Sequence, residues 1–124
     1  FEVINVLGEW KRVLTPGGTL RIAVPNFSSL IKIYDQTGEI DKILGPLYGR
    51  WSTDNDKFIY HKTVYDQKSL TRLLDNCGYV DIQEWDWRKV FENTENYDDH
   101  SQAYFPHMDK VNGIHVSLNL ECKK

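Results

Sequence analysis

One histidine lies among aromatic side chains in a stretch suited to binding a small molecule. Tyr48, Trp51 and Tyr60 precede His61, and Tyr65 follows it. An imidazole titrates near neutral pH and can accept a proton from a bound hydroxyl or amine, so we predict that His61 acts as a general base. We predict that Tyr48, Trp51 and Tyr65 line the pocket, where aromatic rings favour an uncharged or sugar-like group. The alternative is a satellite hydrophobic cluster beneath a long loop.

Two further candidates for substrate contact follow a predicted β-strand. Asn26 and Phe27 come directly after the aliphatic run Leu20 to Val24 and Pro25. Ligands of open α/β sheets bind beyond the carboxyl ends of the strands. We therefore predict that Asn26 and Phe27 contact the same small molecule. Asn26 also has a side chain suited to a helix N-cap, and this structural role is the alternative.

A cluster of acidic and histidine residues has the composition of a metal site without its spacing. Asp98, Asp99, His100 and His107 lie close together in the sequence. No pair has the helical i, i+4 separation of zinc ligands, and carboxylates of a flexible loop are usually solvated. We predict no metal site here.

Charge and cysteine usage limit the possible partners. The chain has 15 Lys and Arg against 18 Asp and Glu, with both signs interspersed, so no basic stripe favours nucleic acid. No apolar run approaches the roughly 20 residues of a membrane span. Cys77 and Cys122 lie far apart, which favours two free thiols in a reducing cytoplasm over one disulfide. We expect a cytoplasmic protein.

The first predicted elements are a helix, a tight turn and a strand. Apolar residues spaced along Phe1 to Leu14 share one helical face. Pro16 cannot continue a helix, and the Gly17-Gly18 pair accepts the backbone angles of a turn. The strand Leu20 to Val24 is aliphatic on both faces except at Arg21, so we predict an interior strand.

The remaining elements are predicted from periodicity and from residues typical of helix ends. A helix follows Asn26, a second short helix begins near Glu39, and a third is capped by Asp66 and closed by Gly78. The last two predicted elements are strands, the second of which presents one apolar face. The predicted ranges of these later elements are Glu39 to Leu44 or Leu47, Gln67 to Asn76, Val80 to Trp87, and Ile114 to Glu121.

The segment Glu9 to Pro25 resembles part of a known enzyme family. Its residues, EWKRVLTPGGTLRIAVP, are similar to the helix, turn and fifth strand of class I S-adenosylmethionine-dependent methyltransferases. In that family an R-hydrophobic-L-K-P-G-G turn precedes the strand, and Thr15 stands here where Lys is usual. The segment Tyr60 to Asp66 also resembles one subgroup of predicted methyltransferases, which carries a His and an aromatic-Asp pair before the next helix.

The resemblance implies a partial Rossmann-like methyltransferase fold of the α/β class, in a single domain over residues 1–124. Leu20 to Val24 would be the fifth strand of that fold, Val80 to Trp87 the sixth and Ile114 to Glu121 the seventh. The seventh strand of the family lies antiparallel between the fifth and the sixth.

The resemblance implies transfer of a methyl group from S-adenosylmethionine to a small acceptor. The family binds this cofactor through a glycine-rich turn after its first strand, and this sequence contains no G-x-G-x-G. The chain also begins at Phe1 rather than Met. We therefore expect the C-terminal portion of such an enzyme, inactive alone and unable to bind the cofactor. The alternative is a non-catalytic binding or assembly module with a methyltransferase-like fold.

A portion of this kind would expose apolar surface. The Leu20 to Val24 strand would become a sheet edge, and such edges pair with other chains. The first helix would likewise lose neighbours, and large exposed apolar patches mark contact surfaces. We therefore expect a homo-oligomer with Ile4, Leu7, Ile22 or Val24 near its interface.

Overall fold

The structure is a computed structural model that describes residues 2–53, 55 and 57–124, without the side chain of Trp51. Its helical elements are α1 (Glu2–Val13), α2 (Phe27–Thr37), α3 (Asp41–Tyr48), α4 (Gln67–Asn76), α5 (Trp87–Val90) and the 3₁₀ turn η1 (His100–Gln102). Its strands are β1 (Thr19–Pro25), β2 (Trp51–Ser52), β3 (Phe58–Ile59), β4 (Val80–Glu84), β5 (Tyr104–Phe105), β6 (Ile114–His115) and β7 (Ser117–Lys123).

The main sheet has the strand order β1-β7-β4. β7 is antiparallel to both neighbours, so β1 and β4 run parallel to each other on either side of it. The predicted pairing, with the last long strand antiparallel between the other two, is confirmed. The chain is therefore a mixed α/β protein.

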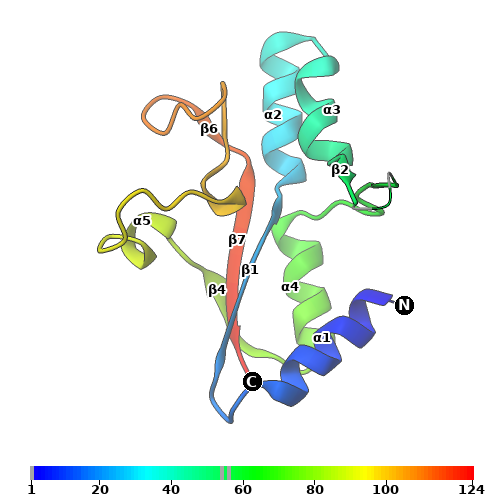
Figure 1. Ribbon diagram of the computed structural model, residues 1–124, viewed down its shortest axis with the longest axis vertical. Helices are drawn as coiled ribbons and strands as arrows, with labels where there is room; N and C mark the ends of the chain where they lie inside the picture. The colour runs from blue at the N-terminus through cyan, green and yellow to red at the C-terminus, as the bar shows by residue number, and fades with distance from the viewer. Residues whose placement is uncertain (1, 54, 56) are drawn as a thin grey trace.

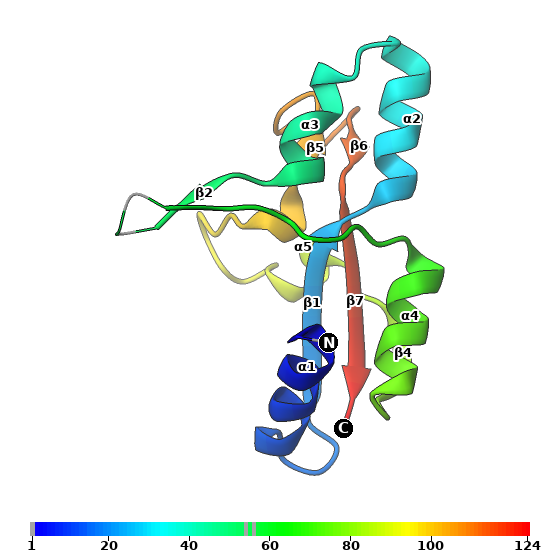
Figure 2. The ribbon, with the colours of Figure 1, turned by 90° about the vertical axis from the view of Figure 1, so that its right-hand side faces the viewer.

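Helices lie on both faces of this sheet and beyond one end of it. α1 and α4 cover one face, whereas α5 lies on the opposite side (Figure 1). α2 and α3 lie side by side beyond the carboxyl end of β1. The hairpin of β2 and β3 projects away from the sheet (Figure 2).

The larger apolar core lies between the sheet and the helices α1 and α4. Its buried members are Leu7, Leu70, Leu74, Tyr79, Leu118, Leu120 and Cys122. Because side chains alternate along a strand, Ser117 and Asn119 of β7 point to the other face, where they are also buried. The prediction of a last strand with one apolar face was therefore incomplete. As the central strand, β7 is covered on both faces.

A smaller apolar core lies beyond the end of the sheet. Leu30 and Ile33 of α2, Ile43 of α3 and Val116 are buried together there. Val116 lies between β6 and β7, so Ile114 belongs to a separate strand that pairs with β5. The single strand predicted from Ile114 to Glu121 is thus two strands, and β7 continues to Lys123.

The predicted helix caps are confirmed. Asn26 Oδ1 accepts a hydrogen bond of 3.1 Å from the Ser28 amide at the start of α2. Asp66 and Ser69 form a reciprocal capping box at the start of α4, and Gly78 closes that helix with φ +79°. The helix α3 runs through Gly45 and Pro46 to Tyr48.

The strand predicted from Val80 to Trp87 ends earlier than expected. β4 stops at Glu84 because Asp86 begins a new helix, with its carboxylate accepting a hydrogen bond of 2.9 Å from the Arg88 amide. Trp87 is the first residue of α5. The strand therefore ends at the helix cap, although the alternation of apolar and polar residues continues to Trp87.

Among the described strands β1 is a sheet edge, as expected for a C-terminal portion, and is not the interior strand that its aliphatic residues alone predicted. β1 pairs only with β7 among the described strands, and Arg21 and Ala23 are exposed. The apolar face of α1 is also largely uncovered. Its exposed members are Val3, Ile4, Val6, Trp10 and Val13.

Leu7, one of the four residues expected near an interface between chains, is buried inside the chain. It is 2% exposed, and its carbonyl accepts a hydrogen bond of 2.8 Å from the buried Tyr79 hydroxyl. Because Leu7 and Tyr79 meet inside the core, their hydrogen bond attaches α1 to the rest of the chain.

Both cysteines are free thiols, as predicted. Burial raises the pKa of the Cys122 thiol to about 11, with a smaller contribution from the charge of Glu121. Within the described ranges, no helix is both long and apolar enough to cross a lipid bilayer.

Candidate functional site

A cavity of about 470 Å³ lies at the carboxyl end of β1. This volume falls within the range of about 300–1,000 Å³ that is common for small-molecule sites. Its walls come from β1, α2, α3, η1, β5 and the start of β7. Its lining includes Pro25, Ile33, Lys42, His61, His100, Tyr104, Phe105, His107 and Val116.

The orientation of His61 leaves one ring nitrogen available for proton transfer. Its Nδ1 lies 3.1 Å from the carbonyl oxygen of Pro46 and 3.3 Å from that of Leu47. A carbonyl oxygen can only accept, so Nδ1 must carry the proton. In the neutral imidazole, Nε2 then has the free lone pair. No described residue donates a hydrogen bond to Nε2, so this atom can act as a base.

The end of α3 holds His61 in this position. The His61 amide donates a hydrogen bond of 2.7 Å to the Tyr48 carbonyl, which fixes the backbone. Gly49 caps the helix with φ +50°, and a β-carbon at this residue would overlap the His61 ring. Glycine is therefore required here both for its backbone angle and for the close approach of the imidazole.

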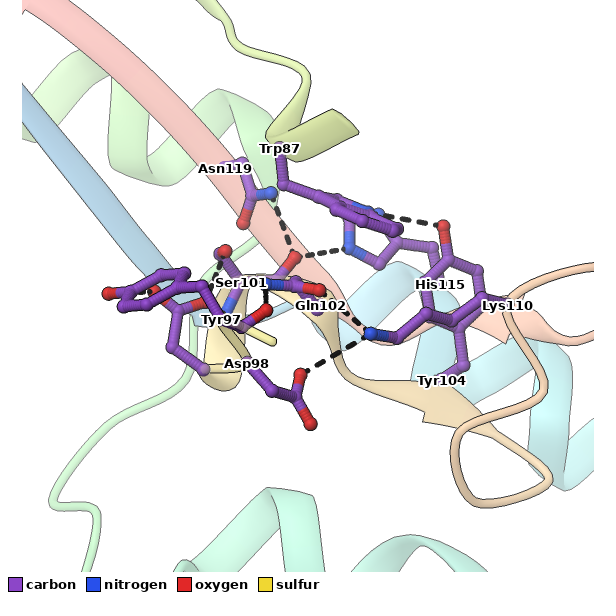
Figure 3. Close-up of polar contacts among 10 residues, drawn as sticks. Trp87, Tyr97, Asp98, Ser101, Gln102, Tyr104, Lys110, His115 and Asn119 are labelled. Atoms are coloured by element: carbon purple, nitrogen blue, oxygen red, sulfur yellow. Dashed lines mark hydrogen bonds and ion pairs between the residues drawn. The ribbon is translucent and has the colours of Figure 1, made fainter. Parts of the chain in front are cut away.

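Tyr104, which also lines the cavity, is held in place by two aromatic neighbours. Its ring stacks on His115 with the centroids 4.8 Å apart, and its hydroxyl accepts a hydrogen bond of 3.4 Å from Trp87 Nε1. Figure 3 shows these three side chains together. The position of Tyr104 at the cavity is therefore fixed by contacts made outside it.

Of the predicted site residues whose side chains are described, only His61 lines this cavity. Asn26 caps α2 and forms an isolated bridge with Tyr65, whose carbonyl accepts a hydrogen bond of 2.9 Å from the Phe27 amide. Tyr65 packs against the larger core, and burial raises the pKa of its hydroxyl. Tyr48 is 56% exposed. The single concavity expected beside Asn26 is thus not formed by these residues.

The prediction for Trp51 concerns a side chain outside the described residues. Its backbone belongs to β2, which pairs with β3. Phe27 and Tyr60 are both partly exposed, and neither lines the cavity. Among the described residues of α3 and the segment up to Tyr65, the cavity is lined by His61, Gly49 and three residues of α3.

A second, smaller cavity of about 320 Å³ contains Asn26. His115 and Asn119 also line it, and both belong to the network drawn in Figure 3. The Ser101 carbonyl accepts hydrogen bonds of 2.8 Å from His115 Nε2 and 3.0 Å from Asn119 Nδ2. Asn119 Oδ1 accepts a further bond of 2.7 Å from the Ser117 hydroxyl. These bonds attach η1 to β7.

The acidic residues near η1 also have structural partners. Asp98 lies 3.4 Å from Lys110 Nζ, which donates a bond of 2.7 Å to Gln102 Oε1. Asp99 accepts a hydrogen bond of 2.9 Å from the Ser101 amide, and another from the Tyr97 hydroxyl that raises the pKa of this tyrosine. In the described part of the chain, no group of three potential ligands is arranged to hold a metal ion.

Sequence reasoning missed most of this network. Ser101, Gln102 and Asn119 are buried polar residues, and neither their types nor their spacing is distinctive. His115 was assigned to a strand rather than to a site. Only the position of η1 against β7 brings these residues together, and the sequence carries no local signal for that contact.

The described residues do not fit S-adenosylmethionine. A glycine-rich turn is needed where a strand passes into a helix, so that the backbone can approach such a cofactor. β1 passes through Asn26 directly into α2, and β4 passes through Trp85 and Asp86 into α5. Neither junction contains glycine.

No protein-family model, no curated protein and no solved structure matches this chain significantly. The assignment of function therefore depends on the geometry of the cavity, the sheet and the sequence motifs.

Proposed function

We propose that this chain is the acceptor-binding, C-terminal part of an S-adenosylmethionine-dependent methyltransferase with a partial Rossmann-like fold. The observation that carries the proposal is the pairing of the sheet. β7 lies antiparallel between β1 and β4, which are parallel to each other. This is the arrangement that the Pro16-Gly17-Gly18 motif before β1 implies.

The position of the cavity supports the same proposal. It adjoins Pro25 at the carboxyl end of β1, where open α/β sheets bind ligands. A small acceptor bound there would contact His61. The methyl donor would be bound by residues outside this chain, since the described residues do not fit it.

The chemical role of this chain is to bind the acceptor and remove its proton. His61 Nε2 accepts the proton from a hydroxyl or amine of the acceptor. Nδ1 keeps its hydrogen bond to the Pro46 carbonyl throughout, and this bond strengthens when the ring becomes positively charged. A cytoplasmic location belongs to the proposal, because Cys77 and Cys122 are free thiols.

One observation favours the assembly module as a second candidate. α1 exposes Ile4, Trp10 and Val13 on a helix that is attached to the core mainly through Leu7. β1 also has an edge to which no described strand pairs. A second copy of the chain would cover both surfaces.

The test of the catalytic proposal uses the full-length gene product, methyl-labelled S-adenosylmethionine and a small-molecule extract of the host cell. We expect label to enter a small molecule and its rate to fall about 10²-fold or more in His61→Asn. An asparagine amide keeps a donor near the position of Nδ1 but cannot accept the proton.

The control is Tyr48→Phe, at the exposed end of α3, because this change keeps the Tyr48 carbonyl that accepts from the His61 amide. It should transfer label at the wild-type rate. Absence of label from every small molecule would contradict the methyltransferase proposal and favour the assembly module. Equal rates for the wild type and His61→Asn would remove His61 as the base.

A further inference from the structure

We infer that the cavity at the end of β1 selects a small organic anion, with an apolar body and one carboxylate or phosphate group. The inference names the substrate class of the same cavity and rests on the proposed function for its chemical role. An organic anion differs from the uncharged or sugar-like group that the aromatic residues predicted. The reason is that the cavity is lined by Lys42 and not by Tyr48 or Tyr65.

Among the described residues, the lining of the cavity includes a positive charge and no negative charge. Lys42 of α3 adds an ammonium group, and His107 adds an imidazole whose N–H can donate to an anion. His61 does not contribute a donor, because its Nδ1 proton is already bonded to the Pro46 carbonyl and its Nε2 accepts. No aspartate or glutamate of the described chain lines the cavity. A cationic ligand would therefore meet no negative charge from the described residues there.

The nearby carboxylates are held away from the cavity by their own partners. Asp99 is bonded to Ser101 and Tyr97, and Asp98 faces Lys110. Asp109 accepts hydrogen bonds of 2.9 Å and 3.3 Å from the amides of Asn112 and Val111. These carboxylates therefore have hydrogen-bond partners outside the cavity, and Asp98 also has an opposite charge.

Glu39 is the one described carboxylate close to the lysine of the cavity. Its Oε2 lies 4.0 Å from Lys42 Nζ, at the limit of an ion pair. Both side chains are about half exposed, so solvent screens this pair and it gives little stabilisation. Lys42 remains available to a stronger partner, such as an anion bound inside the cavity.

Most of the remaining wall is apolar, apart from Ser117 and Tyr104. Ile33 and Val116 belong to the smaller core, and Phe105 and Ala103 pack against it. A ligand that is charged over its whole length would leave polar groups unpaired against these side chains. The lining therefore favours an apolar body with a single charged group.

The experiment compares three probes that share one ring system and differ in charge. 2-Naphthoate, 2-naphthamide and 2-naphthylmethylammonium are titrated into the chain without any methyl donor, and binding is followed by ¹H–¹⁵N NMR. We expect 2-naphthoate to bind about tenfold or more tightly than the amide, with the ammonium weakest. The amide signals of Ala103 and Val116 should shift. 2-Naphthyl phosphate then distinguishes a phosphate site from a carboxylate site.

Lys42→Glu and Lys68→Glu are the matched variants. Both reverse one charge on an exposed helical lysine, but Lys68 lies on α4 and does not line the cavity. The preference for 2-naphthoate over the amide should disappear in Lys42→Glu and persist in Lys68→Glu. Equal loss in both variants would mean an unspecific effect of net charge and would overturn the inference.

Tighter binding of the amide or the ammonium, or no binding of any probe, would also overturn it. These results would leave methyl transfer untouched, because no donor is present. Conversely, selective binding of 2-naphthoate without labelled product in the transfer assay would remove the methyltransferase and keep the anion site.

Discussion

The imidazole of His61 lies against the α-carbon of Gly49, so closely that a side chain at residue 49 would overlap the ring. The same imidazole donates from Nδ1 to the Pro46 carbonyl at 3.1 Å. The end of α3 therefore sets the rotation of the ring and the direction of Nε2. This relationship can be tested without knowing the acceptor.

Gly49→Ala should displace His61. The added β-carbon needs the space of the ring, and φ +50° is unfavourable for alanine. We expect the ring resonances of His61 in ¹H–¹³C NMR spectra to move clearly. Gly45→Ala is the control, because a β-carbon there meets nothing within 4 Å and alanine favours a helix by about 0.5–1 kcal/mol. Unchanged His61 resonances in both variants would refute the contact.

Tyr79→Phe should lower the free energy of unfolding. The substitution removes the buried hydrogen bond of 2.8 Å from the tyrosine hydroxyl to the Leu7 carbonyl, which is worth about 1 kcal/mol. Urea unfolding followed by circular dichroism measures the change. Tyr60→Phe removes a hydroxyl from a side chain that is 52% exposed and should leave stability unaltered. Equal midpoints for Tyr79→Phe and the wild type would contradict this attachment of α1.

Asp66 should make the stability of the chain depend on pH. Hydrogen bonds from the Ser69 amide, and then from the Ser69 side chain, lower the pKa of the Asp66 carboxyl. A pKa that is lower in the folded than in the unfolded chain stabilises the fold above the unfolded value, near 3.9. That stabilisation is lost as the pH falls through the folded value.

Asp66→Asn separates charge from capping. Asparagine is also a good N-cap but does not titrate in this range. We expect the melting temperature of the wild type to fall more steeply than that of Asp66→Asn as the pH drops below about 4. Parallel melting curves for the two proteins over the whole acid range would show that the cap is not pH-dependent.

The chain should associate through α1 and the free edge of β1. Ile4 is 52% exposed on α1, and we expect sedimentation velocity at tens of micromolar to show a dimer or larger species. Ile4→Lys should shift the distribution toward monomer. Ile31→Lys is the control, since Ile31 is similarly exposed on α2, away from these surfaces. A wild-type monomer at this concentration would exclude such assembly.

The chain alone should not bind S-adenosylmethionine at micromolar concentration. Neither strand-to-helix junction of its main sheet has the glycine that such a site requires. Isothermal titration with the cofactor and with its demethylated product is the measurement. A saturable signal with a dissociation constant below about 10 μM, or about −7 kcal/mol, would mean that a site exists among these residues.

Local sequence signals predicted the elements whose ends have distinctive residues. Asn26 and Asp66 cap helices as expected, and the Pro16-Gly17-Gly18 turn separates α1 from β1. The range of β4 was too long because alternation continued past the residue where Asp86 starts a helix. Periodicity alone does not predict whether such a segment continues as a strand or begins a helix.

The candidate site was less predictable because it depends on contacts distant in sequence. His61 was identified from its residue type, but its neighbours in the cavity were not. Lys42 comes from α3, and His100 and His107 come from the segment that folds back over the sheet. Those histidines had been considered only as metal ligands. Tyr65 has a suitable side chain but supports the core.

The apolar interior is divided into two clusters, so substitutions that change the cavity can occur apart from those that affect the packing of the sheet. The cavity takes Ile33 and Val116 from the smaller cluster, and none of the buried members of the larger one lines it. Substitutions at distant sites have nearly additive effects on stability. A lineage of such chains can therefore exchange residues around the ligand and acquire new specificity, while α1 and α4 continue to hold the sheet unchanged.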